Sequence, residues 1–600
     1  MKKRIAILTG ISKNLGMGHL TRMAHLAVFL QNTFEIQFFV HTKENSVPFL
    51  DDKRLRYRIV NDNEQETLIR SFDPHAIFID KRDTLNKDLR KLRRISKILT
   101  FDNAGETAYA DCLINALPLP KEPCIISNYS GKDYLIFNEN IVKFKKIYSP
   151  SRVNNVLISF GGSDPANLSK YVYNIFRELD FDINVKFVVG PLHENNHDFS
   201  PYETIVTNNL PEEISKTDLL ITSFGMTAYE AILIGTLPVL INPTEYHNKL
   251  AQTLEHAVNL GVGGQEKDID RIKAGIVSLI ENPDTLKNQF KLSRRYLDNN
   301  GKERIKDITN ELLKKSDPEC SVCGKAYMPV VHRLEKSNVY FCENCKTLFR
   351  DKDYLVSTDY DADYFFNDYK KQYGKTYLED KQNINKLNEK RVEIINELVT
   401  TKRPVKPLLE LGCAMGFFLE TVKNHGYKPS GIEISRHAAS YCKYTAKLDV
   451  EQGDFLNLDY SRPVYEVISM WYFIEHVKDF KKVIEKCRKV LRDRGIIAIS
   501  TPNCNGISAR KNITSYASRI PGDHYNEFSP ESLTKVFNEN GFKVEKIVST
   551  GVHFSRWLDG RKNILLDNKI GESIYKKLAA KKNLGDTFEI YARKVSPSEI

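Results

Sequence analysis

The chain lacks long hydrophobic runs. Its longest apolar stretches, among them residues 5–8 and 237–241, fall far short of the roughly 20 residues that a membrane-spanning helix requires. The basic residues 2–4 resemble the start of a signal peptide, but the apolar stretch behind them ends at Leu8. This stretch is better explained as a first buried strand. We therefore expect a soluble, cytoplasmic protein without a membrane partner.

Cysteine is used sparingly, and repeats and low-complexity tracts are absent. The sequence has ten cysteines in 600 residues, and four of them form two Cys-x-x-Cys pairs. In a chain without a secretory signal, such pairs favour metal binding over disulfides, which agrees with a reducing compartment.

The excess of positive over negative charge is also small for a chain of this length. The formal net charge of +11 comes from 88 Lys and Arg against 77 Asp and Glu, without a long basic block. Nucleic acid is therefore not the expected partner, although a basic surface also attracts nucleotide phosphates.

The sequence does have short apolar runs that alternate with segments of helical periodicity. This alternation is typical of parallel sheets covered by helices on both faces, so we expect an α/β fold. The first set of strands is expected at residues 4–9, 35–41, 76–80, 96–101 and 112–115, and a second set at 155–160, 184–189, 218–222 and 237–241. A third alternating pattern runs from Pro407 to about Ser549, and a last strand covers 586–594.

A glycine loop follows the first predicted strand. Gly16 and Gly18 precede a helix whose first turn carries His19, and Arg22 lies three residues further on. Glycines there let backbone N–H groups approach an anion at the helix N-terminus. The helix dipole disfavours the imidazolium form of His19 and so keeps a neutral base available near pH 7. The alternative is a tight turn in which His19 only caps the helix.

A second glycine loop follows the strand at 155–160. It consists of Gly161, Gly162, Ser163 and Asp164, and it again precedes a predicted helix, so it offers another loop for phosphate. Downstream, small residues around Thr227 precede a helix on which Glu230 is placed to accept ribose hydroxyls. The segment from Asn248 to Gln252 follows the next strand.

At these residues the chain resembles the GT-B superfamily, in which two Rossmann-like domains face each other and the C-terminal one holds UDP. Gly-x-Gly-His-x-x-Arg with Gly-Gly-Ser-Asp-Pro is similar to the UDP-sugar hydrolases of pseudaminic acid biosynthesis and to spore-coat polysaccharide proteins, over about residues 1–270. The resemblance implies that His19 takes a proton from water, that the water attacks the sugar C1, and that UDP leaves. Where the family pattern has Asp-x-Tyr, this chain has Asp80-Lys81-Arg82. The UDP-sugar site that the resemblance implies contains Gly16, Gly18, Arg22, Gly161, Gly162, Ser163, Asp164, Thr227, Glu230, Asn248 and Gln252.

The two Cys-x-x-Cys pairs predict a zinc ribbon. Cys320 and Cys323 are separated from Cys342 and Cys345 by eighteen residues, and Gly324 supplies the turn of the first knuckle. Four thiolates close a tetrahedral zinc without leaving a position for water, so the expected zinc is structural.

A third nucleotide-binding pattern begins at residue 407. A buried strand containing Glu410 ends in a turn with Gly412 and Gly416, which opens a helix. A dinucleotide site has a similar pattern, but Glu-x-Gly-x-x-x-Gly favours S-adenosylmethionine over NAD. The next strand ends in Glu433, placed to accept both ribose hydroxyls. Further on, Asp454 is placed to accept from the adenine amino group and Phe455 to stack near the ring.

These motifs resemble class I S-adenosylmethionine-dependent methyltransferases over about residues 353–594. In that class the segment after the fourth strand, here Trp471 to Val477, borders the methyl donor, and His476 is our candidate general base for a hydroxyl nucleophile. The alternative is a helix-capping or packing histidine. His524 falls in the predicted acceptor-side loop. Within this domain the sequence lacks the Asp/Asn-Pro-Pro-Tyr/Phe tetrad and the Pro-Cys nucleophile that would favour nucleic acid.

The fusion favours a single carbohydrate pathway. We expect a bifunctional surface-glycan enzyme that hydrolyses a UDP-deoxyamino sugar, similar to UDP-2,4-diacetamido-2,4,6-trideoxy-beta-L-altropyranose hydrolase, and methylates a sugar or glycan. The alternative is a glycosyltransferase or nucleotide-sugar sensor fused to a ribosomal RNA methyltransferase, which would bind RNA in a salt-sensitive manner.

Five segments follow from these patterns. Residues 1–148 and 149–315 are expected as the two GT-B-like Rossmann-like domains, and 316–352 as the zinc ribbon. Residues 353–405 are expected as a helical lid or linker, and 406–600 as the methyltransferase domain.

Overall fold

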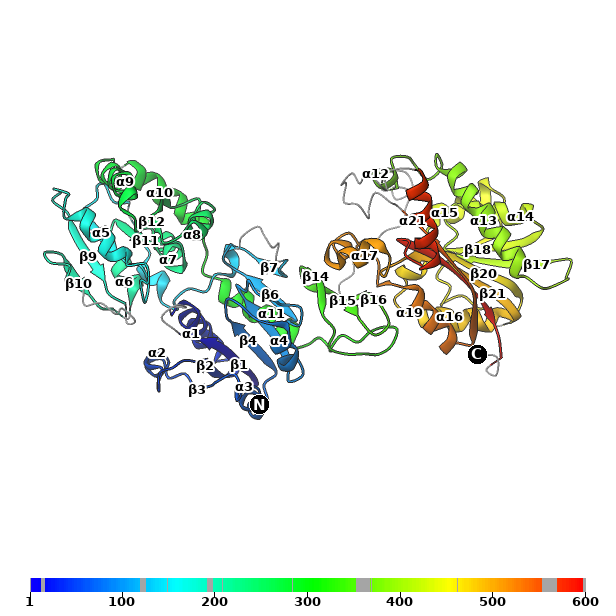
Figure 1. Ribbon diagram of the computed structural model, residues 1–600, viewed down its shortest axis with the longest axis horizontal. Coiled ribbons are helices and arrows are strands. Elements are labelled where there is room, and N and C mark those ends of the chain that lie inside the picture. Colours follow the sequence, from blue (N-terminus) through cyan, green and yellow to red (C-terminus); the bar gives the residue numbers. More distant parts are fainter. Residues whose placement is uncertain are drawn as a thin grey trace. The chain divides into compact units, whose positions relative to one another are not determined.

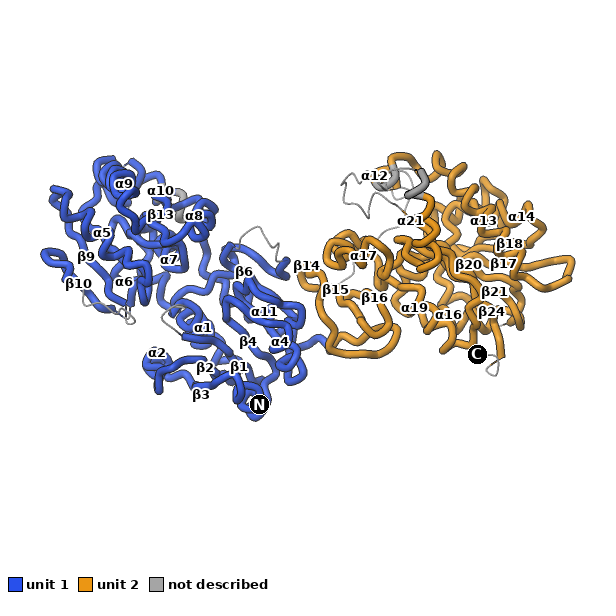
Figure 2. Tube along the Cα trace, viewed as in Figure 1, with its two compact units in different colours: residues 1–316 blue, residues 317–600 orange. Residues whose placement is uncertain are grey.

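The computed structural model describes residues 2–11, 17–118, 126–147, 149–190, 198–207, 209–282, 284–351, 367, 369–460, 462–552 and 569–596. The chain separates into two compact units, Met1–Ser316 and Asp317–Ile600 (Figure 2). Gly16 and residues 353–366 of the predicted lid lie outside the described residues. The finer division into five domains stays a prediction.

The first unit begins with a seven-stranded parallel sheet of order β3-β2-β1-β4-β5-β6-β7 (Figure 1). The short edge strands β3 and β7 were not expected, because they have three and two residues and no apolar run. The strands are β1 (Lys3–Gly10), β2 (Phe34–His41), β3 (Tyr57–Ile59), β4 (Ala76–Asp80), β5 (Lys97–Phe101), β6 (Cys112–Asn115) and β7 (Tyr129–Ser130). The helices are α1 (Gly18–Leu30), α2 (Pro48–Asp52), α3 (Gln65–Phe72) and α4 (Asn86–Arg93).

A second parallel sheet of the same unit has the order β10-β9-β8-β11-β12-β13. Its strands are β8 (Asn155–Ile158), β9 (Asn184–Val188), β10 (Glu203–Ile205), β11 (Leu219–Thr222), β12 (Leu237–Asn242) and β13 (Val258–Val262). The helices are α5 (Leu168–Phe176), α6 (Leu210–Ser215), α7 (Met226–Ile234), α8 (Glu245–Ala251), α9 (Ile269–Glu281) and α10 (Asp284–Tyr296). Both sheets confirm the expected Rossmann-like α/β architecture.

Helix α11 (Gly301–Leu312) returns to the first sheet instead of continuing along the second. Its Ile305 and Ile308 are buried in the same apolar cluster as Leu20 of α1. A Cβ at Gly301 would lie 2.1 Å from the carbonyl oxygen of Leu135, so only glycine permits this close approach. The last of the three helices that follow β13, α11, therefore packs on the first sheet.

The second unit contains a seven-stranded sheet of order β19-β18-β17-β20-β21-β24-β23, in which β24 is antiparallel to both neighbours. This strand order is that of a class I methyltransferase. The strands are β17 (Lys406–Leu411), β18 (Tyr427–Glu433), β19 (Val450–Gln452), β20 (Tyr465–Trp471), β21 (Leu491–Pro502), β23 (Phe542–Thr550) and β24 (Thr587–Lys594). The helices include α12 (Tyr369–Tyr373), α13 (Lys381–Leu398), α14 (Phe417–Asn424), α15 (Arg436–Ser440), α16 (Phe480–Val490), α17 (Ile507–Lys511), α18 (Ile513–Ala517), α19 (Pro530–Glu539) and α21 (Lys569–Lys581).

Helix α13 lies in the segment expected as a lid or linker, yet it packs into the methyltransferase core. Its Arg391 is buried, lies 4.0 Å from the ring centre of Trp471, and donates to Glu589 at 2.7 Å. Val392 and Ile395 of the same helix are fully buried. This part of the segment is therefore a structural element of the fold.

The cysteine-rich region forms a small antiparallel sheet that the methyltransferase completes. Strands β14 (Val330–Leu334), β15 (Ser337–Cys342) and β16 (Thr347–Arg350) pair in sequence order, and β22 (Asn526–Glu527) adds to β16. Cys320, Cys342 and Cys345 share one apolar cluster with Phe528 and other methyltransferase residues. The two parts of this unit therefore have a common core.

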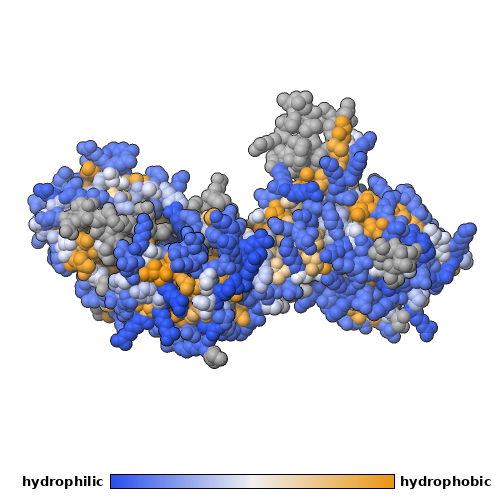
Figure 3. Space-filling model, turned by 60° about the horizontal axis from the view of Figure 1, so that its bottom comes forward, coloured by the Kyte–Doolittle hydropathy of each residue, from blue (hydrophilic) through white to orange (hydrophobic). Residues whose placement is uncertain are grey.

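Polar residues dominate the face drawn in Figure 3, where apolar areas are small and separated. Among the exposed apolar side chains are Ile147, Val206 and Tyr444. Within the part of the chain that the structure describes, no helix combines the length and apolarity needed to span a bilayer.

Candidate functional sites

The first candidate site lies where β1 and β4 end beside α1. His19 is in the first turn of α1, and its Nδ1 lies 2.6 Å from Oδ1 of Asp80, the last residue of β4. Asp80 is fully buried, whereas His19 is partly exposed. A buried carboxylate on one ring nitrogen fixes the orientation of an imidazole and stabilises its protonated form, which is what a general base requires.

Arg22 links this pair to a second carboxylate. It is buried, its Nε donates to Oδ2 of Asp80 at 2.5 Å, and its other nitrogens donate to Asp80 Oδ1 and Asp102 Oδ2. Burial opposes ionisation of Asp80, but the charges of Arg22 and His19 outweigh it and lower the pKa of Asp80. Burial raises the pKa of Asp102 although Arg22 opposes the shift. Arg22 therefore positions the acids, and its place as a direct UDP-sugar contact stays a prediction.

In the sequence, Asp80 stands out only as part of the departure from the family pattern, and the motif alone assigns it no role. Its partner His19 is 61 residues away along the chain. The available signal was an acid that ends a completely apolar strand, because a charge at the carboxyl edge of a parallel sheet faces the loops of the neighbouring strands.

The second glycine loop meets the N-terminus of α1. A Cβ on Gly162 would lie 3.7 Å from the side chain of Met17, which immediately precedes α1. Asp164, however, caps α5, because its two carboxylate oxygens accept from the backbone N–H groups of Leu168 at 2.9 Å and Ser169 at 2.8 Å. The N-terminus of α5 thus already holds an anion. Gly161, Gly162 and Ser163 remain the predicted phosphate loop, and Gly18 has open space around it.

Helix α7 carries an unpaired acid. Burial raises the pKa of Glu230 to about 7, and none of the residues that the structure describes donates a hydrogen bond to it. Such a carboxylate has free acceptor capacity for hydroxyl groups. Thr227 lies in the first turn of the same helix.

The predicted sugar-facing residues on α8 differ from one another. Asn248 is used within the fold, since its Oδ1 accepts from Asn259 at 2.9 Å and its Nδ2 donates to Glu245 at 3.1 Å. Gln252 caps α8 and is exposed. Both keep their predicted ligand roles as hypotheses.

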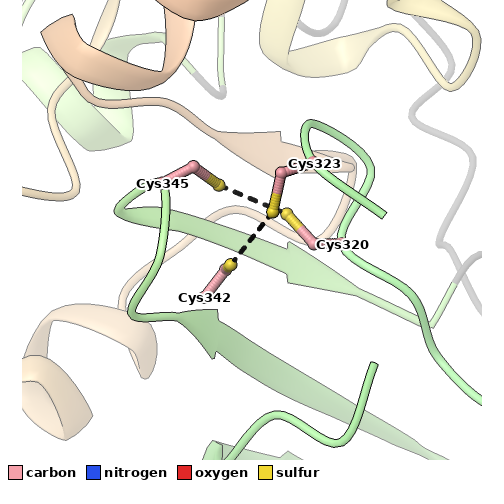
Figure 4. Close-up of side chains that lie close together, drawn as sticks. All are labelled: Cys320, Cys323, Cys342 and Cys345. Atoms are coloured by element: carbon pink, nitrogen blue, oxygen red, sulfur yellow. Dashed lines mark hydrogen bonds between the residues drawn. The ribbon is translucent and has the colours of Figure 1, made fainter. Parts of the chain in front are cut away.

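The four cysteine sulfurs converge between the two knuckles and the end of β15 (Figure 4). The Sγ atoms of Cys320 and Cys345 are 3.4 Å apart, those of Cys323 and Cys342 are 3.6 Å apart, and all four lie within 4.8 Å of one another. A tetrahedral zinc with Zn–S bonds of about 2.3 Å requires sulfur separations of about 3.8 Å. The donor set and its spacing therefore fit zinc.

The glycine turn after β17 is held by its backbone conformation and by close packing. Gly412 and Gly416 have φ values of +68° and +75°. A Cβ on Gly412 would lie 2.6 Å from the ring of Phe473, and one on Gly416 would lie 2.5 Å from Leu448. Backbone conformation and packing against protein thus require glycine at both positions, and their contact with S-adenosylmethionine stays a prediction.

Two acids at the ends of neighbouring strands suit S-adenosylmethionine. Glu410 is buried, its Oε2 has no hydrogen-bond partner among the described residues, and burial raises its pKa well above the ordinary value. A ligand ammonium group would satisfy this oxygen. Glu433 accepts from the backbone N–H groups of Ala414 and Ser435, both at 2.8 Å, while burial raises its pKa. Each of its oxygens keeps a lone pair for a ribose hydroxyl.

The two residues predicted for the adenine side differ in exposure. Phe455 is 2 % exposed and lies in the core, with the ammonium group of Lys486 4.7 Å from its ring centre. Protein groups thus surround the ring, and its predicted stacking near adenine stays a hypothesis. Asp454 is exposed and its Oδ1 accepts from the N–H of Leu456 at 2.9 Å.

The segment after β20 brings two histidines together. The ring centres of His476 and His524 are 4.5 Å apart at an interplanar angle of 83°. His476 Nδ1 lies 3.2 Å from Asp523 Oδ2, and His524 Nδ1 lies 2.5 Å from Glu527 Oε1. Glu475, which the sequence did not single out, is buried beside them, and burial raises its pKa to about 7. The cluster can hold or remove protons at an acceptor oxygen.

Comparisons with known proteins place the methyltransferase. Residues 381–547 match the family model described as a methyltransferase domain. Over 179 residues the chain is 23 % identical to a ubiquinone biosynthesis O-methyltransferase of Coxiella burnetii. The aligned region covers 28 % of this chain and 75 % of that protein. A solved S-adenosylmethionine-dependent methyltransferase from Archaeoglobus fulgidus is similar at 19 % identity and a TM-score of 0.28, over 36 % of this chain and 99 % of that one. The chain thus contains an S-adenosylmethionine-dependent methyltransferase domain.

Two further relatives are similar to this chain. The chain is 31 % identical over 281 residues to the uncharacterized protein MJ1062 of Methanocaldococcus jannaschii, which covers 41 % of this chain and 56 % of that protein. It is 26 % identical over 278 residues to the spore coat polysaccharide biosynthesis protein SpsG of Bacillus subtilis, over 41 % of this chain and 80 % of SpsG. The SpsG similarity covers the N-terminal half. The chain therefore spans little more than half the length of MJ1062.

Proposed function

We propose that this protein is a bifunctional enzyme of surface-glycan biosynthesis, which hydrolyses a UDP-deoxyamino sugar and methylates a sugar or glycan hydroxyl. The observation that carries the proposal is the presence, on one chain, of a methyltransferase domain and an N-terminal half similar to SpsG, whose name assigns it to polysaccharide biosynthesis. One pathway that uses both reactions explains their fusion.

The methyltransferase site is assigned to the carboxyl ends of β17 and β18. Glu410 would bind the ammonium group of S-adenosylmethionine, and Glu433 would accept from its ribose hydroxyls. When bound, this cofactor supplies an electrophilic methyl group on a sulfonium. The predicted base His476, together with Glu475 and His524, would bind the acceptor hydroxyl and remove its proton. The structural support is the convergence of these side chains beyond the end of β20.

The hydrolase site is assigned to His19 and Asp80. His19 would accept a proton from water, the water oxygen would form a bond to the sugar C1, and the bond between C1 and the phosphate oxygen would break, so that UDP leaves with the electron pair. The support is the 2.6 Å contact that holds His19 by a buried carboxylate. Glu230 would accept from the ribose of UDP, and the Gly161–Gly162–Ser163 loop would bind phosphate.

A structural zinc completes the proposal. Cys320, Cys323, Cys342 and Cys345 would supply four thiolates and leave the metal no open position. The sheet that they begin is continuous with the methyltransferase through β22, so the zinc would stabilise the second unit and take no part in the reaction.

Two assays test this function. Methyl-labelled S-adenosylmethionine is offered together with UDP-sugars, free sugars and RNA, and the label is expected in the carbohydrate. Label in RNA alone would contradict the proposal and support the RNA methyltransferase alternative. UDP release is measured for the wild type and His19→Ala, and the variant is expected to lose release. Binding of UDP-sugar without release by the wild type would instead indicate a sensor.

A further inference from the structure

We infer that Glu475, His476 and His524 bind a divalent cation of a first-row transition metal, at a site separate from the four cysteines. The three residues each offer one ligand atom, and these atoms lie within 4.8 Å of one another. Two imidazoles and one carboxylate on one face are the donor set of many open metal sites, in which three protein ligands leave other positions for substrate oxygens.

A carboxylate oxygen lies close to Nδ1 of each imidazole ring. Asp523 Oδ2 lies 3.2 Å from Nδ1 of His476, and Glu527 Oε1 lies 2.5 Å from Nδ1 of His524. A metal-binding histidine usually donates its other ring N–H to a carboxylate, which fixes the tautomer and raises the basicity of the ligating nitrogen. With Nδ1 facing a carboxylate in each ring, Nε2 is the nitrogen that would bind the cation.

Glu475 supplies an independent indication of a ligand. Its side chain is 1 % exposed, and its Oε2 accepts from the hydroxyl of Thr501 at 3.1 Å. Its Oε1 is buried and has no hydrogen-bond partner among the described residues. Leaving a buried carboxylate oxygen unsatisfied is costly, and each such atom in a fold requires an explanation. A cation between Oε1 and the two imidazoles would supply the missing partner.

The outer carboxylates are themselves held in place. Glu527 lies on β22, which pairs with β16 of the cysteine-rich sheet, and its Oε2 accepts from the hydroxyl of Tyr516 at 2.7 Å. The charge of Arg350 interacts with both Glu527 and Asp523. Rigid support of this kind keeps ligands within the narrow tolerance that a metal site requires.

The donor set selects the class of cation. Mg²⁺, Ca²⁺ and Mn²⁺ prefer oxygen ligands, whereas imidazole suits Zn²⁺, Fe²⁺, Ni²⁺ and Cu²⁺. The four thiolates around Cys320 form a softer and closed site, so the two sites would hold their metals with different strength. The catalytic consequence rests on the proposed methyltransferase function. A cation here would bind the acceptor oxygen and lower the pKa of its hydroxyl, whose proton would pass to solvent. With the cation bound, His476 would be a ligand, and this role replaces the base role given to it under the proposed function.

The test measures metal binding and needs no substrate. The full chain is dialysed against a weak chelator, its metal content is determined by mass spectrometry, and Co²⁺ is then titrated into it while the visible absorption is recorded. The expected result is one retained cation per chain, at the cysteines, and one exchangeable cation with a nitrogen–oxygen ligand spectrum. Absence of the exchangeable cation would overturn the inference.

Variants locate the exchangeable cation. His524→Ala is expected to abolish its binding and to keep the retained cation, and Glu527→Gln to weaken it by about 10 to 100-fold. His425→Ala is the matched control, because this histidine pairs with Glu389 on the surface, and it should bind both cations. If His524→Ala no longer binds S-adenosylhomocysteine and so has misfolded, Glu475→Gln replaces it. Unchanged Co²⁺ affinity in a folded His524→Ala or Glu475→Gln protein would overturn the inference, whatever the outcome of the methylation assays.

Discussion

The carboxylate of Asp80 lies 2.6 Å from Nδ1 of His19, although the two residues are 61 positions apart in the sequence. The contact joins the end of β4 to the first turn of α1, and Arg22 binds the same carboxylate from the other side. A histidine held in this way has a fixed orientation, and a cation formed on its ring would be stabilised. This relationship is the main structural support for the hydrolase activity that we propose for the first unit.

Asp80→Asn tests this relationship. We expect the rate of UDP release to fall by about 100-fold or more, because the amide cannot stabilise a protonated His19 and can hold the wrong tautomer. Release is measured with a coupled assay on purified protein. Asp83→Asn, an exposed acid in the following loop, is the control and should keep the wild-type rate. Equal rates for both variants would remove Asp80 from the mechanism.

The unpaired acid on α7 should make stability depend on pH. Burial raises the pKa of Glu230 from 4.5 to about 7 in the folded protein, so its contribution to stability is fully present below about pH 4.5 and is lost as the pH rises through about 7. Glu230→Gln should therefore be more stable than the wild type at pH 8, by about 1 to 3 kcal/mol, and the difference should shrink toward pH 4.5.

Denaturant unfolding of the first unit, followed across this pH range, gives the difference. Glu266→Gln changes an exposed residue of the same unit and should behave as the wild type. A stability difference between Glu230→Gln and the wild type that does not vary with pH would show that Glu230 titrates normally.

Glu433→Gln should weaken the binding of S-adenosylhomocysteine by about tenfold or more, because hydrogen bonds from hydroxyls to a charged carboxylate contribute about 1.5 to 3 kcal/mol each. Calorimetric titration measures the affinity, and thermal unfolding shows whether the loss of the carboxylate has also disturbed the N–H groups of Ala414 and Ser435. Glu393→Gln, exposed on α13, should bind with wild-type affinity. Unchanged affinity in Glu433→Gln would contradict the ribose assignment.

Removal of zinc should destabilise the whole second unit. Cys320, Cys342 and Cys345 pack in the same core as Phe528, and β16 pairs with β22. Cys320→Ser is therefore expected to lose zinc and to lower the unfolding temperature of the methyltransferase along with that of the small sheet. Cys112→Ala, in β6 of the other unit, should retain zinc. Full zinc content in Cys320→Ser would disprove the four-cysteine site.

The sequence predicted those strands that a run of apolar residues is enough to identify. Strands such as β1 and β11 are continuous apolar runs, and their observed bounds agree closely with the predicted ones. Strands β3, β10 and β22 have two or three residues and exist only because a neighbouring strand offers unpaired backbone groups, so local pattern could not reveal them.

The site residues likewise fall into those that the sequence could identify and those that it could not. Glu433 ends the strand after the glycine turn, and motif spacing was enough to single it out. Asp80 and Glu475 acquire their surroundings from segments distant in sequence or from burial. The burial of Phe455 could not be read from the sequence, because a phenylalanine after an acid has the same letters whether it faces a ligand or the core.

The most direct test of the account is mass spectrometry of the wild-type protein incubated with a panel of UDP-2,4-diacetamido sugars, with and without S-adenosylmethionine. The account predicts UDP and free sugar from at least one substrate in both mixtures, and a carbohydrate heavier by one CH₂ unit only in the mixture with the methyl donor. Intact UDP-sugars and unmethylated carbohydrate in every mixture, from a protein that binds S-adenosylhomocysteine normally, would contradict it.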